Sequence, residues 1–361
     1  MRLLPSDQIK RRLLQCIQEG RYETGHGLPT IQELARTFQV STKTVQKAIH
    51  ALRKEGVINA KRGVGLSVRS PGPRIGRGRR VGLVFPNAPR YVEQQPYPGT
   101  VIRELEAELR RSKLTLVRCP LETMERMALT DRLARLKLAG LVLFEIDNDS
   151  MILEFRELRL PMVSMDYDAY RHGVPSVVFD NAFGSFQATK HLVGLGHRGI
   201  AFLRPLLRNP MFSPSLDAVE EERLKGYRIA MLDAGLPTEI REFENQPAAL
   251  RQALQELLGR RPAPTALVCV ADWSARAIAR EIMRMGFRVP EDLSLVGFGD
   301  YGLEIAPGRR LTSVWVDYEG MGRTAGQILK DVLEGNGPRA RRAVLPARLA
   351  PGHTVSPPPA L

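Results

Sequence analysis

The stretch that decides the fold runs from Gly27 to Val68 and reads GLPTIQELARTFQVSTKTVQKAIHALRKEGVINAKRGVGLSV. Thr30 is a good N-cap for a helix and Glu33 follows three residues later, which is the pattern of a capping box behind Pro29. Apolar residues then recur at helical spacing and share one face: Ile31, Leu34, Ala35 and Phe38. The pattern predicts a short amphipathic helix.

A second helix is predicted immediately afterwards. Ser41 offers another N-cap and Gly56 ends the run. The apolar stripe of this helix consists of Val45, Ala48, Ile49 and Leu52. Two amphipathic helices joined by three or four residues predict a helix-turn-helix. Next come two β-prone runs, residues 57–60 and 66–69, which flank a glycine-containing turn at 61–65 and predict a two-stranded wing.

The outer face of the second helix carries hydrogen-bonding and cationic residues: Thr42, Lys43, Gln46, Lys47 and His50. Such a face suits a DNA major groove, because Gln46 can make a bidentate contact with adenine and lysines can contact guanine or phosphate. Any small helical bundle has a polar outer face, so polarity alone also fits a solvated surface. The order of the motifs favours DNA binding.

That order resembles the winged helix of the gluconate-repressor (GntR) family of bacterial transcription regulators. The resemblance covers residues 5–70 and rests on the motifs LPT at 28–30, ELA at 33–35, VS at 40–41, TV at 44–45, AI at 48–49, EG at 55–56 and GVG at 63–65. It implies a DNA-binding set of Thr30, Gln32, Thr42, Lys43, Thr44, Gln46, Lys47, Lys61, Arg62 and Gly63. The family commonly has an arginine where this chain has Gln32, so its preferred bases do not carry over.

Charge is concentrated in the same part of the chain. Of a formal net charge of +14, residues 1–80 contribute +12, from 17 Lys and Arg against 5 Asp and Glu. This is the excess expected for phosphate attraction, although lysines on a solvated face would also produce it. The three cysteines, Cys16, Cys119 and Cys269, lie far apart without metal-ligand spacing and are expected to be buried thiols in a reducing compartment.

Length and pattern predict several lobes. The 361 residues are 43% hydrophobic, exceed one typical domain, and contain no run of about 18 apolar residues and no export signal, so we expect a cytoplasmic protein with no membrane partner. We expect a winged helix-turn-helix domain at 1–69, a basic Pro/Gly linker at 70–80 and an effector domain at 81–361.

From residue 81 onward, short apolar runs alternate with amphipathic helices, which predicts an α/β fold of doubly wound parallel sheets. We expect two lobes, the first at about 81–170 plus 315–350 and the second at about 171–300. A ligand crevice is expected at the carboxyl ends of their strands.

Several motifs resemble the effector domain of the lactose/galactose-repressor (LacI) family over residues 79–355. They are SVVFDN at 176–181, HL at 191–192, LGHRGIA at 195–201, RLKGY at 223–227, VPEDLSLVGF at 289–298, LTSV at 311–314 and MG at 321–322. The resemblance implies the fold of the periplasmic sugar-binding proteins, in which two lobes joined by three crossovers close on a small molecule.

The resemblance also implies cleft residues. Arg223 matches an arginine that grips sugar oxygens, Phe179 an aromatic wall and Asp166 an acidic contact, while Asp300 ends a familiar polar motif. Trp273 is a candidate platform for a sugar ring, although a lone Trp after a strand is often a core residue. Two polar positions depart from the sugar-responsive pattern: the usual Asn-Asp is Ala271-Asp272, and the usual Gly-Phe-Asp-Asp ends in Gly299-Asp300.

No phosphate-binding loop or nucleophile elbow occurs, and His191 and His197 lack an acidic residue at metal spacing, so we expect neither an enzyme nor a cofactor or metal. The preferred interpretation is a homodimeric transcriptional repressor that binds a two-fold DNA operator and a small molecule, expected to be a carbohydrate. One alternative is a small-molecule sensor whose N-terminal bundle is an interaction module. Another is a constitutive DNA binder whose cleft has lost its ligand.

Overall fold

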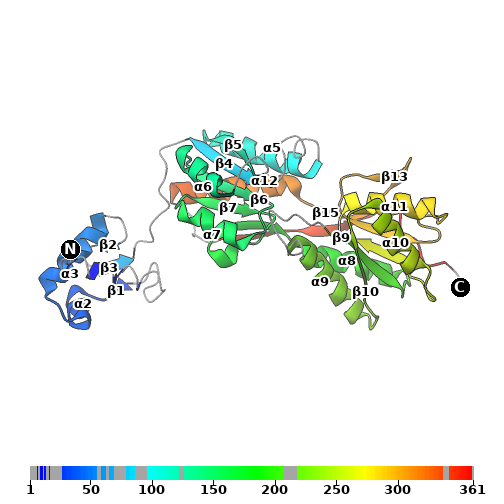
Figure 1. Cartoon of the computed structure of the whole chain (residues 1–361), viewed down its shortest axis with the longest axis horizontal. Coiled ribbons are helices and arrows are strands. Elements are labelled where there is room, and N and C mark those ends of the chain that lie inside the picture. The colour runs from blue at the N-terminus through cyan, green and yellow to red at the C-terminus, as the bar shows by residue number, and fades with distance from the viewer. Residues whose placement is uncertain are drawn as a thin grey trace. The chain divides into compact units, whose positions relative to one another are not determined.

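The computed structural model divides the chain into two compact units, Met1–Ile75 and Gly76–Leu361 (Figure 1). The structure describes residues 6, 9–10, 12–13, 16, 27–54, 58–61, 65–68, 79–86, 96–121, 126–206, 218–335 and 341–359. Most of the predicted linker, residues 70–78, lies outside these ranges. Arg80, the last residue of that linker, instead begins the first strand of the second unit.

The N-terminal unit has the predicted helix-turn-helix. Helix α2 spans Ile31–Phe38 and helix α3 spans Thr42–Lys54. Three short strands form an antiparallel sheet in the order β1-β3-β2: β1 Gly27–Leu28, β2 Ile58–Lys61 and β3 Gly65–Val68. The helices and the sheet share one apolar core, made of Ile9, Leu13, Leu28, Leu34, Ala35, Val45, Ala48, Ile49, Leu52 and Ile58.

The second unit contains two lobes, each a parallel sheet with helices on both faces, as predicted. In the first lobe the strand order is β16-β8-β7-β6-β4-β5. Its elements are β4 Arg80–Phe85, α5 Pro96–Arg111, β5 Thr115–Pro120, α6 Arg126–Arg135, β6 Gly140–Phe144, α7 Asp149–Glu157, β7 Met162–Met165, the 3₁₀ helix η2 Tyr170–His172, β8 Ser176–Phe179, α12 Tyr318–Glu334 and β16 Arg342–Leu345. Helices α5 and α12 cover one face of this sheet, and α6 and α7 cover the other.

In the second lobe the strand order is β10-β9-β11-β12-β15-β17, with only β17 antiparallel to its neighbour. Its elements are α8 Asn181–Gly194, β9 Ile200–Leu206, α9 Ala218–Asp233, β10 Glu239–Glu244, α10 Pro247–Leu258, β11 Ala266–Cys269, α11 Asp272–Arg284, β12 Ser294–Gly299, β13 Glu304–Ala306, β14 Arg309–Arg310, β15 Thr312–Val316 and β17 Ala347–Ala350. Helices α8 and α9 cover one face, and α10 and α11 cover the other (Figure 1).

The predicted lobe boundaries are wrong at two places. The second lobe does not begin at 171, because β8 pairs in parallel with both β7 and β16 in the first sheet. The connection before β8 contains only η2, so no crossover helix in the sequence marks β8 as a strand of that sheet. The chain then returns to the first lobe only for α12 and β16, since β15 and β17 complete the second sheet.

Three short segments connect the lobes. Residue 180 follows β8, residue 317 follows β15 and residue 346 separates β16 from β17. Strand pairing places these segments side by side: Leu345 is the register partner of Phe179, and Ala347 is the partner of Val316. Asp180 and Asp317 each accept a hydrogen bond at the start of the helix that follows. The three crossovers implied by the family resemblance are therefore present.

Close helix packing in the second lobe depends on one glycine. A Cβ added at Gly226 of α9 would lie 2.0 Å from the carbonyl oxygen of Ala182 and 2.9 Å from the backbone nitrogen of Phe186 in α8. Backbone atoms cannot move aside as a flexible side chain can, so this contact requires glycine. The α8–α9 pair in turn positions Arg223, one turn before Gly226.

Among the described residues, no helix has both the length and the apolar composition needed to span a membrane. The same described ranges contain no group of three or more His, Cys, Asp or Glu residues placed to hold a metal ion. Cys119 and Cys269 are buried free thiols, and Cys16 is partly buried.

Candidate DNA-reading face and interlobe cleft

Helix α2 begins with the predicted capping box. The backbone N–H of Glu33 donates to Thr30 Oγ1 at 3.3 Å, and the backbone N–H of Thr30 donates to Glu33 Oε2 at 2.7 Å. This backbone hydrogen bond from Thr30 lowers the pKa of Glu33. The Thr30 hydroxyl, a predicted DNA contact, therefore already serves the helix cap.

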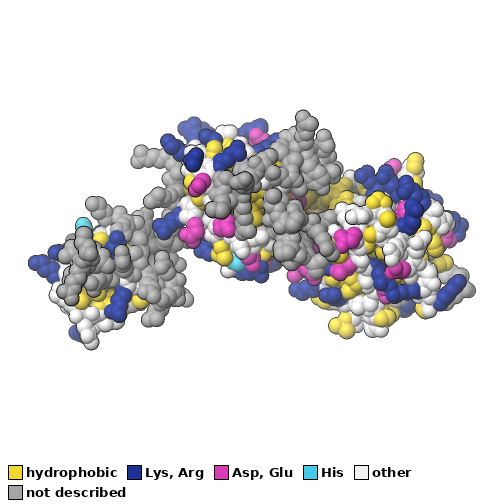
Figure 2. All heavy atoms as spheres, viewed as in Figure 1, with side chains coloured by type: hydrophobic (Ala, Val, Ile, Leu, Met, Phe, Trp, Pro, Cys, Tyr) yellow, Lys and Arg dark blue, Asp and Glu magenta, His cyan; other side chains and the backbone are white. Residues whose placement is uncertain are grey.

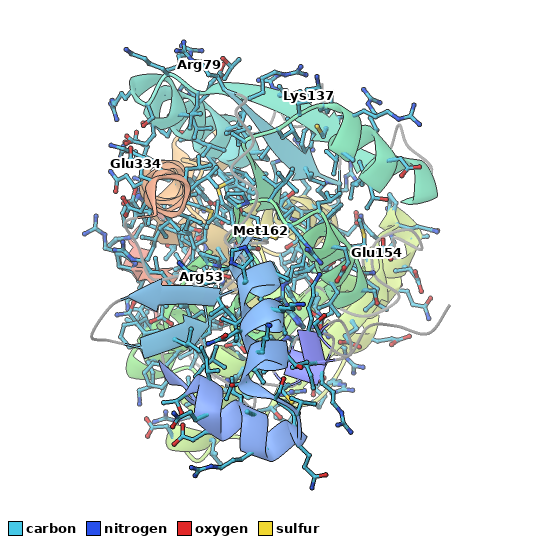
Figure 3. All side chains as sticks on the ribbon, turned by 90° about the vertical axis from the view of Figure 1, so that its left-hand side faces the viewer. Arg53, Arg79, Lys137, Glu154, Met162 and Glu334 are labelled. Carbon is cyan, nitrogen blue, oxygen red and sulfur yellow. The ribbon has the colours of Figure 1, made fainter. Side chains whose placement is uncertain are left out.

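Helix α3 has its own cap and a clear division of faces. The backbone N–H of Thr44 donates to Ser41 Oγ at 3.1 Å, and the two hydroxyls are 2.8 Å apart. Val45, Ile49 and Leu52 are buried in the domain core. The opposite face exposes Thr42, Lys43, Gln46, Lys47 and His50. Figure 3 labels Arg53 in the last turn of this helix.

The turn between the two helices brings two predicted DNA contacts together. Gln32 of α2 and Thr42 of α3 line the same shallow depression, together with Arg36, Gln39 and Ser41. Gln39 makes the turn in the left-handed conformation, with φ of +53°. The side chain of Lys61 and the whole of Arg62 and Gly63 lie outside the described residues, so their predicted role stays a prediction.

In the second unit, Arg223 is held by three contacts, all with residues of the second lobe. Its Nε donates to Asn181 Oδ1 at 2.9 Å and its Nη1 to the carbonyl of Val270 at 2.8 Å. Its guanidinium carbon lies 4.0 Å above the ring of Phe298, a cation–π contact. Nη2 makes no hydrogen bond within the described part of the chain, so it can donate to a ligand.

Aromatic residues from both lobes meet in the cleft. Phe179 lies 5.7 Å from Tyr318 and 6.4 Å from Tyr97, measured between ring centroids. Tyr97 also contacts Tyr318 at 4.8 Å, and Tyr318 stacks on Tyr301 at 5.6 Å with an interplanar angle of 8°. Of this aromatic cluster, Phe179 was among the predicted ligand residues. The sequence also suggests Tyr97 and Tyr301 as ligand candidates in mouth loops, but Tyr97 lies in α5; Tyr318, the first residue of α12, was not predicted.

Asp166 lies beside this aromatic cluster. Burial, together with the nearby carboxylates of Asp166 and Glu145, raises the pKa of Tyr97, so its phenol stays protonated at neutral pH. Asp166 and Glu145 both adopt positive φ, +71° and +55°, at the ends of strands β7 and β6. Positive φ is uncommon for residues other than glycine, and it often accompanies a functional position.

Asp272 is a buried carboxylate that the sequence analysis did not propose as a ligand residue. Ser313 Oγ donates to its Oδ1 at 2.6 Å and the backbone N–H of Tyr301 donates to its Oδ2 at 3.1 Å. Burial raises its pKa to about 6, against the lowering effect of these hydrogen bonds. Its carboxylate therefore fixes the loop after β12, which carries Tyr301.

Asp300, a predicted ligand residue, forms an ion pair within the second lobe. Arg310 Nη2 donates to both carboxylate oxygens of Asp300, at 2.8 and 2.9 Å. The backbone N–H of Asp300 also donates to Ser313 Oγ at 3.1 Å. The sequence did not indicate this pairing, because Arg310 belongs to the separate hairpin of β13 and β14.

Trp273 lies apart from the aromatic cluster. It is 39% exposed and lines a cavity of about 260 Å³ between α10 and α11, together with Phe243, Pro247 and Leu250. None of Arg223, Phe179 and Tyr301 lines this cavity. The role of Trp273 as a platform for a sugar ring stays a prediction.

Gly299 explains one departure from the sugar-responsive pattern. Its φ is +130°, and an added Cβ would lie 2.8 Å from the Tyr318 hydroxyl and 3.0 Å from the Tyr301 ring. The Tyr318 hydroxyl donates to the Gly299 carbonyl at 2.7 Å. A carboxylate at this position would collide with the tyrosine pair.

Comparisons with known proteins agree with both halves of this description. Residues 5–68 match the bacterial regulatory proteins of the gntR family, and residues 189–355 match the periplasmic binding protein-like domain. The chain is 27% identical to the arabinose metabolism transcriptional repressor of Geobacillus stearothermophilus, over 91% of this chain and 90% of that protein. It is 26% identical to the HTH-type transcriptional repressor PurR of Photobacterium profundum, over 84% and 92%.

Solved structures show the same fold. A complex of the transcriptional regulator CelR with cellobiose superposes with a TM-score of 0.67 and 24% identity, over 91% of this chain and all of that one. The lac repressor dimer bound to operator and an anti-inducer superposes with a TM-score of 0.65 and 20% identity, over 78% and 95%. The chain thus joins a region that matches the gntR family of bacterial regulatory proteins to a region that matches the periplasmic binding protein-like domain, and the relatives that it resembles over most of its length are transcriptional repressors.

Proposed function

We propose that this chain is a homodimeric repressor that binds a two-fold DNA operator and that a small molecule in the interlobe cleft controls its affinity for that operator. The observation that carries the DNA-binding part is the outer face of α3, where Lys43, Gln46 and Lys47 are exposed beside a buried apolar stripe. Figure 2 shows the basic side chains that lie on the surface of the N-terminal unit. Repression, as opposed to activation, is proposed because the relatives that the chain resembles are transcriptional repressors.

The ligand proposed is a carbohydrate or a carbohydrate derivative. Arg223 offers a guanidinium N–H to the cleft, and aromatic rings such as Phe179 can pack against the apolar face of a sugar. Solved relatives of the same fold hold cellobiose and ribose. A dimer is proposed because a single winged helix contacts one half-site, and two-fold pairing doubles the contacts.

Two measurements test this proposal. DNA selected from a random library should contain inverted half-sites, and its affinity for the protein should fall steeply with salt, as phosphate contacts require. A thermal-shift screen against monosaccharides, oligosaccharides, sugar acids and nucleosides should find a compound that raises the unfolding midpoint, because a ligand of the folded state stabilises it by mass action.

Arg223→Ala should abolish that thermal shift and leave operator affinity near normal. Arg228→Ala is the matched control, since Arg228 lies on the same helix but is exposed. If Arg223→Ala removed DNA binding as well, the separate roles of the two domains would be contradicted.

A second candidate is a repressor that binds DNA constitutively. Two observations favour it: Asp300 is paired with Arg310, and the hydroxyl of Tyr318 is bonded to the carbonyl of Gly299. These polar groups are thus bonded to other protein groups and are less available to a ligand. Tight, salt-dependent operator binding, with no thermal shift from any compound in the screen, would favour this candidate.

A further inference from the structure

Tyr318 connects the two lobes through its side chain. It is the first residue of α12, which packs against α5 and the first sheet, so its backbone belongs to the first lobe. Its hydroxyl donates to the carbonyl of Gly299 at 2.7 Å, and its ring stacks on Tyr301; both of these partners belong to the second lobe. The cleft is therefore bridged by a hydrogen bond and a ring stack from one side chain.

The second lobe is shaped to receive this side chain. Gly299 has φ of +130° and leaves no room for a Cβ, which would lie 2.8 Å from the Tyr318 hydroxyl. Tyr301 is held in place by the hydrogen bond from its backbone N–H to Asp272, which Ser313 also fixes. The second lobe thus offers Tyr318 open space at Gly299 and a neighbouring residue, Tyr301, whose backbone is held by Asp272.

The first lobe supports the other side of the same ring. Tyr97 and Phe179 contact Tyr318 at 4.8 and 5.7 Å between centroids. Because ring contacts lie on both sides, the phenol has a defined position, so its hydrogen bond needs little further ordering.

We propose that the contact of Tyr318 with Gly299 and Tyr301 is an interlobe latch, which holds the two lobes at the angle seen in this structure and which a ligand must displace to change that angle. A neutral hydrogen bond of this kind shifts an equilibrium about fivefold, and loss of the ring stack adds to that shift. The inference concerns the cleft of the proposed function, but its test needs neither ligand nor DNA.

The test measures the distance between the lobes. Spin labels are attached at Leu153→Cys in α7 and Leu232→Cys in α9, which are 46% and 79% exposed, in a Cys16→Ser background that retains the buried Cys119 and Cys269. Pulsed electron–electron double resonance on the full chain, mixed with an excess of unlabelled protein so that a dimer carries at most one labelled chain, should give one narrow distance distribution. Tyr318→Phe should add a second, longer population, and Tyr318→Ala should make that population the major one.

Tyr167→Phe is the matched control. It removes a phenol hydrogen bond of the same length, 2.7 Å to Asp149, but this bond lies within the first lobe, so the distribution should not change. Circular dichroism of each variant establishes that it is folded. A narrow distribution that stays unchanged in both Tyr318 variants would overturn the latch, as would a broad one in the parent protein, and the proposed function would survive either result.

Discussion

The outer face of α3 and the interlobe cleft both carry polar side chains, but they use them differently. On α3, Lys43, Gln46 and Lys47 are exposed and make no hydrogen bonds to other described residues. In the cleft, Arg223 and Asp300 are already bonded to protein groups. A partner of α3 therefore meets side chains ready to bind. A ligand of the cleft would meet only Nη2 of Arg223 without a described partner and would compete with Arg310 for Asp300, which lowers its net affinity.

The largest expected effect comes from disrupting the close packing of α8 against α9, which positions Arg223. Gly226→Ala should lower the free energy of unfolding of the effector domain by about 4 kcal/mol or more, because the new methyl group would overlap backbone atoms of α8. Urea unfolding followed by circular dichroism measures this loss.

Gly194→Ala is its control, since a Cβ at Gly194 in α8 would meet no atom within 4 Å. This variant should keep or slightly raise stability, because alanine favours a helix more than glycine does. Equal losses in the two variants would show that the helix contact is not the cause.

A smaller effect is expected from substitutions on the exposed face of α3. Gln46→Ala should cost about 2 kcal/mol at one base pair of the operator, and that position should lose its base preference, because a bidentate contact is removed. Lys47→Ala should instead weaken binding to all sequences alike and reduce the salt slope by about one. Fluorescence anisotropy with single-base operator variants separates these two outcomes; identical profiles for both variants would contradict a base contact from Gln46.

The smallest expected effect is a pH dependence of the free energy of unfolding, caused by the buried carboxylate of Asp272. The exposed side chains of α3 have no such buried titrating group among them. The folded pKa of Asp272, about 6, lies above the ordinary value of about 4, so the folded protein binds this proton more tightly and the group's destabilising contribution lessens as pH falls through 6. Between about pH 7.5 and pH 5 the contribution should change by about 1.4 kcal/mol.

The check compares the unfolding free energy of the wild type with that of Asp272→Asn at both pH values. Other titrating groups are common to both proteins, including His197, whose pKa is lowered by burial and which acts in the opposite direction. The difference between the two proteins should therefore shift in favour of the wild type at the lower pH. A difference that stays constant with pH would mean that Asp272 does not titrate in this range.

Local sequence signals predicted the N-terminal unit well. Thr30, Glu33 and Ser41 act on backbone groups three residues away, so their caps can be recognised in the sequence itself. The alternation of strands and helices likewise predicted the doubly wound lobes.

The cleft was harder to predict because its contacts join distant residues. Tyr318 contacts Gly299 and Tyr97, which are 19 and 221 residues away in the sequence. The periodicity of a sequence does not predict contacts between residues so far apart. Asp300 was expected to face a ligand, but its partner Arg310 lies on a hairpin that was not predicted. The strand β10 was also missed, because its charged residues give it the composition of an edge and not of a buried strand.

The three crossovers have a mechanical consequence. Because residues 180, 317 and 346 lie side by side, they form a ribbon that can bend but strongly resists twisting or sliding. The lobes then have essentially one soft degree of freedom, rotation about an axis through that ribbon. If a ligand binds between the lobes as proposed, its effect on their arrangement would be a change in this one angle.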